Sequence, residues 1–320
     1  MFKNLIIFSL FILLPSLLLA QKIDNTAAFR AINSDRYFRF HYDNDYFSAT
    51  DENYTQGYNL ELVDPILSKN PINFLFLNPK TSQTQFGISI EHIGFTPPRI
   101  GSREIQYGER PFAAAIMLKN FSISTDTLGR TRLLSSLSLG IIGPGAFGKE
   151  MQVAIHKATG NTIPLGWRNQ IKNDVVINYE LGYEKELYRL QDWFALQSNS
   201  AIRLGTLSTN ASVGLQTTLG LINSPFTASD VNKKFKLYGY SQVTGSVIGY
   251  DASLQGGIFN KTSPYTIADN EIERFTGQFN YGLILQLKSV YLEYFRAVLT
   301  REFEAGDATK WGGIRIGIQL

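Results

Sequence analysis

The feature that most constrains the fold is a two-residue alternation of apolar with polar or small side chains, repeated in stretches of about ten residues. It is clearest at the C-terminal end, where Ile314, Ile316, Ile318 and Leu320 alternate with Arg315, Gly317 and Gln319. Residues 86–91, 201–205 and 213–221 repeat it. Because successive side chains of a strand point to opposite faces, the pattern predicts strands with one apolar face. That face would pack on a core in a soluble sandwich and contact lipid in a membrane barrel.

Aromatic content and strand length favour the barrel. The chain has 16 Tyr and 22 Phe, many near the ends of expected strands, as in the aromatic girdles of membrane barrels. After the N-terminal segment, no apolar run reaches helix-spanning length, so the chain crosses a membrane as a closed barrel or not at all. We therefore predict an all-β fold, a twelve-stranded antiparallel transmembrane β-barrel. The expected strands are residues 35–45, 54–64, 83–94, 111–125, 130–141, 173–189, 192–205, 208–222, 234–254, 274–287, 290–303 and 309–320.

Connections on the periplasmic side of such a barrel are expected to be short, as at Gln191-Asp192 and Lys288-Ser289. The chain departs from the usual barrel pattern at its last residue, which is Leu320 rather than an aromatic residue.

The N-terminus predicts export. A short basic start, Met1-Phe2-Lys3-Asn4, precedes an apolar run from Leu5 to Ala20. This is the pattern of a secretory signal peptide, and the run falls short of the roughly 20 apolar residues that a retained spanning helix needs. We expect residues 1–20 to be a signal peptide and residues 21–320 a single barrel domain in the outer membrane of a Gram-negative bacterium.

Composition excludes several classes of site. The chain has no cysteine, so it has neither disulfides nor a thiolate metal centre. Its net charge is +3 and no Lys/Arg run stands out, so nucleic acid is not an expected partner. His41, His92 and His156 are too dispersed for a zinc signature, and the G-x-S-x-G elbow of serine hydrolases is missing. Gly143, Gly145 and Gly148 match a dinucleotide-binding pattern, but without βαβ units they are better explained as a tight loop.

Residues 142–172 interrupt the strand pattern. Lys149 to Thr159 reads as a helix that Gly160 terminates. Gln152 and His156 are four residues apart and therefore share one face of this helix. A short helix inserted between barrel strands on the loop side is the kind of element that carries function.

An acidic and amide cluster follows the first aromatic strand, with Asn44 and Asp45 at its end and Thr55 shortly after. Asn44 and Asp45 could form an Asx turn that ends the strand. Alternatively, their carboxylate and amide oxygens could bind Ca²⁺, a hard cation that prefers such ligands. The spacing is not that of an EF-hand.

Several blocks in sequence resemble one family. They are Asn44-Asp45, Tyr54-Thr55-x-Gly57, Gly108-Glu109-Arg110-Pro111-Phe112-Ala113, Gly143-Pro144, Glu150-x-Gln152-x3-His156-x3-Gly160 and Trp167-x2-Gln170-x2-Asn173. Their order and spacing resemble the LpxR-type lipid A 3′-O-deacylases of the Gram-negative outer membrane. The resemblance extends from about residue 35 to residue 175, and beyond it only the barrel periodicity agrees.

The resemblance implies a barrel with a loop-side site that removes an ester-linked 3′-acyloxyacyl chain from lipid A, with Ca²⁺ as cofactor. His156 falls on the family's catalytic histidine, which would act as a general base on water. The remaining site residues implied are Asn44, Thr55 and Gln152 in catalysis, Asp45 with Asn44 at the metal, and Arg99, Arg103 and Arg110 at the substrate. Asn161 and Thr162 stand where the family can carry a carboxylate, so the partner that orients His156 stays open.

Two alternatives remain at this stage. A non-enzymatic barrel, either a pore or an adhesin, explains the signal, the alternation and the girdles equally well. An outer-membrane phospholipase would share the chemistry, although the serine nucleophile usual for that class has no motif here. The expected partners are lipopolysaccharide and the membrane, and a monomer is favoured, while the acyl chain removed and the full calcium ligand set stay undetermined.

Overall fold

A computed structural model describes residues 23–48, 54–222, 224–226 and 235–320. The expected signal peptide, residues 1–20, lies outside the described residues.

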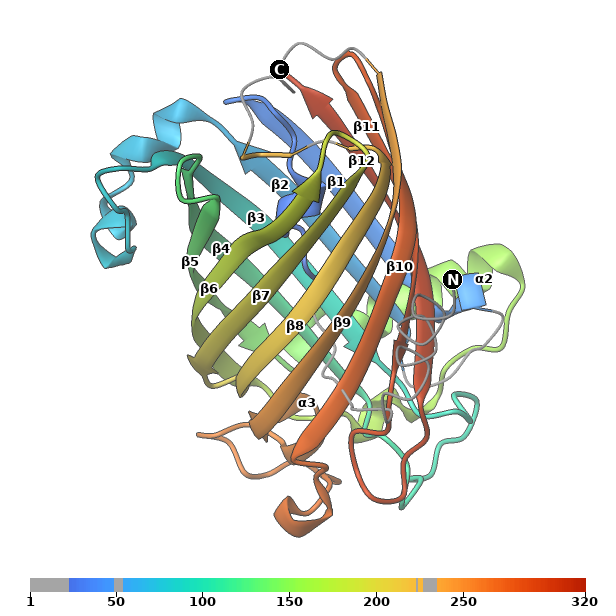
Figure 1. The fold of residues 1–320 in the computed structure, drawn as a ribbon. Helices are drawn as coiled ribbons and strands as arrows, with labels where there is room; N and C mark the ends of the chain where they lie inside the picture. The colour runs from blue at the N-terminus through green and yellow to red at the C-terminus, as the bar shows by residue number, and fades with distance from the viewer. Residues whose placement is uncertain (1–22, 49–53, 223, 227–234) are drawn as a thin grey trace, which may run out of the picture.

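The described strands form one closed antiparallel barrel, in which each strand pairs with its neighbours in sequence and β1 pairs with β12 (Figure 1). The predicted twelve-stranded barrel is confirmed. The strands are β1 (Tyr37–Asn44), β2 (Gln56–Val63), β3 (Gln83–Phe95), β4 (Ala113–Asp126), β5 (Thr131–Ile142), β6 (Asp174–Leu190), β7 (Phe194–Gly205), β8 (Ser208–Leu221), β9 (Phe235–Asp251), β10 (Phe275–Leu287), β11 (Val290–Leu299) and β12 (Thr309–Gln319).

The predicted strand ranges differ most at the end of β11. We expected this strand to reach residue 303, but it ends at Leu299. Phe303 instead makes an isolated bridge with Ile272 and packs in a small apolar cluster with Ile248 and Leu254. Alternation alone could not distinguish this loop cluster from a continuing strand, because Phe303 is a buried apolar residue in either case.

Helical segments lie between the strands. They are η1 (Ala28–Arg30), η2 (Asp45–Ser48), η3 (Pro65–Lys69), η4 (Pro71–Leu75), η5 (Pro144–Ala146), α2 (Gly148–Thr159), η6 (Gly166–Asn169), α3 (Ala252–Gln255) and η8 (Asp269–Glu271). The predicted loop helix is therefore present, and it ends at Gly160 in the left-handed conformation (φ 71) that favours glycine. Among the described residues, no helix is long and apolar enough to span a membrane.

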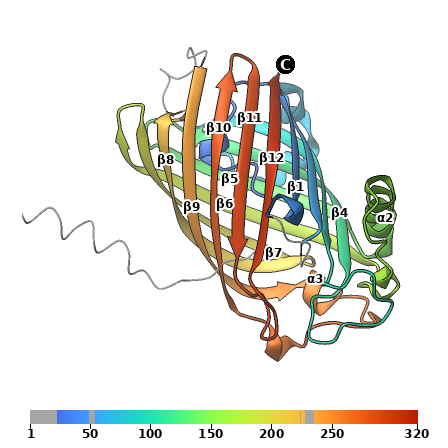
Figure 2. The same ribbon diagram turned by 90° about the vertical axis from the view of Figure 1, so that its right-hand side faces the viewer.

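The two ends of the barrel differ. The connections after β1, β5 and β9 carry η2, α2 and α3, and the long connections after β3 and β11 lie at the same end, which we call the loop end (Figures 1 and 2). The opposite end, the turn end, has tight connections at Gln191 and Lys288, whose φ values of 49 and 50 suit tight hairpin turns. The expectation of short connections is wrong for residues 64–82, which carry η3 and η4 at the turn end.

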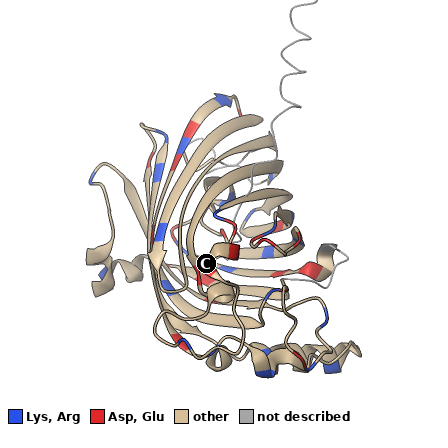
Figure 3. Ribbon diagram, turned by 90° about the horizontal axis from the view of Figure 1, so that it is seen from below, with Lys and Arg blue, Asp and Glu red and all other residues tan. Residues whose placement is uncertain are grey.

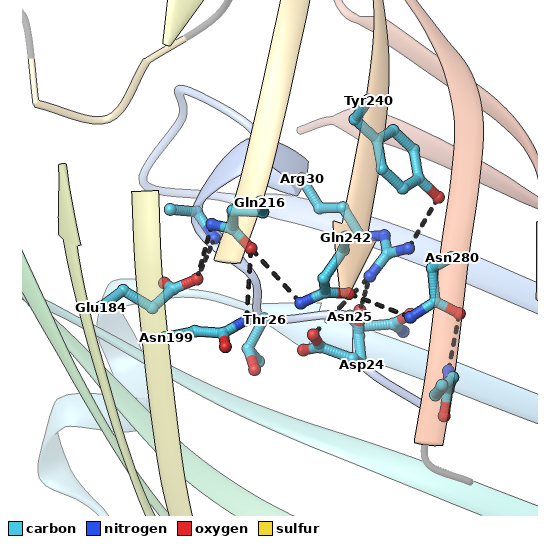
Figure 4. Close-up of polar contacts among 12 residues, drawn as sticks. Asp24, Asn25, Thr26, Arg30, Glu184, Asn199, Gln216, Tyr240, Gln242 and Asn280 are labelled. Atoms are coloured by element: carbon cyan, nitrogen blue, oxygen red, sulfur yellow. Dashed lines mark hydrogen bonds and ion pairs between the residues drawn. The ribbon is translucent and has the colours of Figure 1, made fainter. Parts of the chain in front are cut away.

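The N-terminal segment, residues 23–36, runs inside the barrel and reaches the rim at Asp35 and Arg36, which are exposed. Arg30 is buried, and its Nε is 3.0 Å from Oε1 of Glu293 on β11, while its Nη2 donates to the hydroxyl of Tyr240 on β9 at 2.8 Å (Figure 4). Arg315 on β12 adds a second contact to Oε1 of Glu293 at 2.8 Å. The backbone N–H of Ala28 donates to Glu184 on β6 at 2.9 Å. This segment is thus attached to opposite parts of the wall.

Amide side chains of β8, β9 and β10 line the lumen beside this segment. Gln216, Gln242 and Asn280 form a ladder across β8, β9 and β10, with bonds of 3.3 and 3.0 Å between successive members (Figure 4). A cavity of about 100 Å³ remains between this wall and residues 24–27. The lumen is therefore largely filled by polar side chains and by the chain's own N-terminal segment.

The outer wall is apolar over much of its surface. Val213, Leu215, Val243 and Leu283 are all about half exposed, as expected for side chains that contact lipid. Acidic and basic positions are interspersed over the ribbon when it is seen from the loop end (Figure 3). The apolar half of each alternating pattern thus faces outward, opposite to the arrangement in a soluble sandwich.

Candidate functional site

Helix α2 lies outside the barrel wall at the loop end, beside β4 (Figure 2). Its close approach depends on Gly148, where an added Cβ would lie 2.4 Å from Cβ of Ala114 and 2.8 Å from the ring of Trp167. Gly143 has a φ of 109 and would place a Cβ 2.6 Å from the backbone of Asn173. The glycine-rich stretch is therefore a tight packing loop, as the sequence indicated.

The face that α2 buries is polar. Gln152 and His156 are 1 % and 8 % exposed, whereas Ala154 and Ala158 are exposed and Ile155 is partly exposed. A helix that only covers a wall would bury its apolar residues. The predicted shared face of Gln152 and His156 is confirmed, and this face is turned toward the barrel wall. Burying these polar groups costs desolvation free energy, which packing alone does not explain.

A backbone carbonyl orients His156. Its Nδ1 is 2.6 Å from the carbonyl oxygen of Thr162 in the loop that follows α2. Because a carbonyl can only accept, Nδ1 carries the proton, and in the neutral imidazole Nε2 has the free lone pair. No partner for Nε2 is found among the residues that the structure describes. The open question of an orienting partner is thus answered by main chain rather than by a carboxylate.

Gln152 is held by Trp167. The indole Nε1 of Trp167 donates to Oε1 of Gln152 at 2.6 Å, and the ring of Trp167 packs against Phe112 at 5.1 Å between centroids. The Nε2 of Gln152 is buried and has no hydrogen-bond partner within the described part of the chain. A buried amide N–H without a partner is a group that a bound substrate or water could satisfy.

Asn44 and Thr55 are joined where β1 ends and β2 begins. The Nδ2 of Asn44 donates to the carbonyl oxygen of Thr55, and its Oδ1 accepts from the N–H of Tyr46 at 2.7 Å. The second bond closes an Asx turn, one of the two explanations that the sequence analysis gave for Asn44 and Asp45. The hydroxyl of Thr55 lies 2.6 Å from that of Thr96 in the loop after β3. Asp45 follows as a buried residue at the start of η2.

His92 connects this strand end with the helix. It is buried on β3, and its Nε2 is 2.9 Å from the carbonyl oxygen of Ala146, two residues before α2. Its neighbours Glu91 and Ile93 line the lumen, so His92 faces outward. His41, in contrast, points inward and lies 3.0 Å from Asp43.

The three arginines expected at the substrate occupy different environments. Arg99 and Arg103 are exposed in the loop after β3, which bonds to the loop after α2 through Ile100 and Leu165 at 2.9 Å. Arg110 is buried, bonded to Glu302 and to Ser253, and lies over the ring of Phe95. The substrate role of all three stays a prediction, and the geometry suits it at Arg99 and Arg103.

Oxygen atoms that a hard cation prefers are present around Asp45. Asp45 supplies a carboxylate, and Asn44 and Thr55 supply amide, hydroxyl and carbonyl oxygens beside it in the chain fold. Within the described residues, no group of three or more His, Cys, Asp or Glu side chains could hold a metal ion. The donor chemistry therefore fits Ca²⁺, with further ligands required from other oxygens.

All the predicted catalytic and metal residues lie at one end of the barrel. β1 ends at Asn44 at the loop end, and α2 connects β5 and β6 at that same end. Hydrogen bonds lead from Asn44 to Thr55, from the N–H of Thr55 to Gly94 at 3.0 Å, and from His92 on the same strand to the loop before α2. The two halves of the site are therefore parts of one connected structure.

Comparison with known proteins agrees with the barrel fold. Among solved structures, LpxR from Salmonella typhimurium matches with a TM-score of 0.73 and 17% sequence identity, covering 89% of this chain and 100% of that one. The β domain of the Bordetella autotransporter BrkA gives a TM-score of 0.44 at 8% identity, covering 89% and 98% of the two chains. None of the curated proteins matches this chain.

The family model described as outer membrane protein LpxR matches residues 5–320, which is nearly the whole chain. The chain therefore belongs to the LpxR family of outer-membrane proteins.

Proposed function

We propose that this protein is a lipid A deacylase of the outer membrane, which hydrolyses the ester that holds the 3′-acyloxyacyl chain. One observation carries the proposal: α2 buries its polar face, with Gln152 and His156, against the outside of the barrel at the loop end. A site on the outer wall is reached by a substrate that lies in the membrane. Longer loops mark the extracellular end of such barrels, where lipopolysaccharide is found.

His156 acts as the general base. With its Nδ1 proton bonded to Thr162, Nε2 takes a proton from water as the water oxygen attacks the ester carbonyl. The bond between the carbonyl carbon and the 3′ sugar oxygen then breaks, and that oxygen takes the proton back from Nε2, which releases the acid and restores the neutral imidazole. Gln152 offers the unpaired N–H of its amide to an oxygen of the substrate. Because water is the nucleophile, the mechanism needs no serine nucleophile, in agreement with the missing elbow motif.

Asp45, Asn44 and Thr55 would hold Ca²⁺. When bound, the ion would polarise the ester carbonyl and offset the negative charge that develops on its oxygen. Arg99 and Arg103 are exposed beside the loop that follows α2. They are suited to donate charge-assisted hydrogen bonds to the phosphates of lipid A.

The alternative of a passive pore is not favoured by the lumen. Residues 23–36 cross it, and Arg30 and Glu293 are joined there in a buried ion pair. A conducting barrel of this class keeps an open aqueous channel. The candidate site also lies on the outside of the barrel wall, where polar residues would not contribute to a pore.

The decisive experiment is mass spectrometry of lipid A from a Gram-negative host that expresses the protein. We expect His156→Ala to lower deacylation by about 10²- to 10⁴-fold, the usual contribution of a general base. Lys157→Ala is the matched control, because Lys157 is the next residue of α2 and is exposed. Heat-modifiable migration on gels shows that both variants form the barrel.

Retained deacylation in His156→Ala would remove this residue from the mechanism. Acyl chains released from phospholipid rather than lipid A would assign the protein to the phospholipases. A calcium chelator is expected to abolish activity, and added Ca²⁺ to restore it. Activity that persists in the chelator would exclude the proposed cofactor.

A further inference from the structure

The outer wall of β4 and β5 has an unusual polar patch. Asn120, Ser122, Ser124 and Ser135 point outward, on the same face as the lipid-exposed Leu118 and Leu139. Comparable outward positions on β8 hold Val213, Leu215 and Leu219. Hydroxyl and amide groups without partners in hydrocarbon are costly, so a bare patch of this kind would destabilise a membrane barrel. All four polar residues are instead at most 5 % exposed, and Ser122 alone of the four has a hydroxyl without a hydrogen-bond partner among the described residues.

The cover is the connection between β2 and β3, residues 64–82, which we call the flap. Figure 1 shows it outside the wall, beside β4 and β5. Hydrogen bonds link the flap to the patch and to β6: Asn70 to Asn120 at 2.9 Å, Leu77 N–H to Ser135 at 3.1 Å, Ser124 to Asn78 at 3.3 Å, and Tyr179 to the carbonyl of Leu75 at 2.6 Å. The flap therefore lies against the membrane-facing wall and does not extend away from the barrel.

The backbone of the flap is satisfied largely from within. Pro65 and Pro71 begin η3 and η4 and have no N–H to satisfy. The side chains of Asp64 and Asn70 accept from the N–H groups one residue after each proline, at 2.9 and 3.1 Å. The amide of Asn73 donates to two carbonyls of η3, at 2.9 and 3.0 Å. Irregular backbone is tolerated at membrane depth only when its polar groups are satisfied in this way.

The opposite side of the flap is apolar and exposed. Ile66, Phe74 and Leu77 are 66 %, 83 % and 52 % exposed, and Leu75 is 40 % exposed. We propose that the flap forms part of the lipid-contacting surface of the barrel, with these four side chains among the acyl chains of the membrane. It replaces the apolar side chains that β4 and β5 lack, so the apolar band continues from the exposed wall at Leu118 and Leu139 across the flap.

Flanking residues agree with a position near the edge of the hydrocarbon layer. Lys69 at the end of η3 and Lys80 after η4 are both exposed. Lysine can extend its ammonium group toward lipid headgroups while its aliphatic part stays in the apolar layer. The proposal does not depend on the catalytic function, because none of these residues belongs to the site at the loop end.

The chain has no cysteine, so single-cysteine variants give unique labels. We would attach a nitroxide at Phe74→Cys in the full chain, reconstitute it in phospholipid vesicles, and compare its collisions with oxygen, which concentrates in lipid, and with a water-soluble nickel chelate. Leu215→Cys on the wall of β8 is the lipid control, and Leu128→Cys at the tip of the β4–β5 turn, 97 % exposed, is the water control. Heat-modifiable migration confirms that each labelled chain is folded.

We expect the label at residue 74 to collide several-fold less with the nickel chelate than the label at residue 128, with an oxygen accessibility close to that at residue 215. Leu77→Cys is expected to give the same result, which guards against a local effect of one label. Nickel accessibility at both positions equal to that at residue 128 would overturn the proposal and place the flap in water. Lipid A deacylation by these variants reports on the catalytic proposal separately.

Discussion

Glu293 provides the sharpest test of the filled lumen. Its Oε1 accepts from Arg30 at 3.0 Å, Arg315 at 2.8 Å and Tyr240 at 2.6 Å, and its Oε2 accepts from Tyr291 at 2.6 Å. The carboxylate is fully buried and is shared by two buried guanidinium groups. Glu293→Gln keeps the shape of the side chain but leaves both arginines without this negative charge. Breaking a buried pair by removing one partner costs about 3–5 kcal/mol.

The assay is equilibrium unfolding in urea of the refolded barrel in detergent, followed by tryptophan fluorescence. With m values of about 1–3 kcal/mol per molar, the expected loss lowers the unfolding midpoint by roughly 1–5 M. Glu304→Gln is the control, because Glu304 is exposed in the loop after β11. The double variant Arg30→Met with Glu293→Gln is expected to recover part of the loss, because it also removes one uncompensated charge.

A change of less than about 0.5 kcal/mol in Glu293→Gln would refute the reasoning, since that is the size of an ordinary surface effect. It would mean that Arg30, and with it residues 23–36, does not occupy the lumen. The argument against a pore would then fail as well.

Two further outcomes are expected. Burial raises the pKa of Glu302, in the loop after β11, from its ordinary value of 4.5 to about 7, although the nearby Arg110 opposes the shift. Because the folded state then binds the proton more tightly, this contribution is fully present below about pH 4.5 and is lost as the pH rises through about 7, at most about 3 kcal/mol. Urea midpoints that fall between about pH 5 and pH 8 in the native chain, and fall less in Glu302→Gln, would agree, while a midpoint that rises over this range would contradict it. Trp167→Phe keeps the packing on Phe112 but removes the hydrogen-bond donor to Gln152. We therefore expect the rate of deacylation to fall about tenfold, equivalent to one hydrogen bond of about 1.4 kcal/mol. An unchanged rate would show that this contact does not position Gln152.

The strand pattern could be predicted closely because it depends on local rules. Alternation has a period of two in any strand, so most ranges were right to within a few residues, and the helix that ends at Gly160 follows from its own residues. The long connection at residues 64–82 was not expected, because short turns are the general rule for barrels and no local signal shows that β4 and β5 need an outside cover.

The sequence supplied the candidate residues of the site but not their arrangement. The family blocks identified Asn44, Thr55, Gln152 and His156, and helical spacing placed the last two on one face. The carbonyl of Thr162 that orients His156 could not be predicted, since any residue type supplies a carbonyl. The buried position of Arg110 beside Glu302 also depends on a contact between residues far apart in the sequence.

The sequence by itself determined the twelve strands, the loop helix and the family, because periodicity, glycine positions and motif order are properties of the chain read along its length. Only the tertiary structure decided that residues 23–36 enter the lumen and that residues 64–82 cover a polar part of the wall. The physical reason is closure of the barrel. It converts one alternating pattern into two environments, and the satisfaction of buried charges and hydroxyl groups then depends on segments far away in sequence.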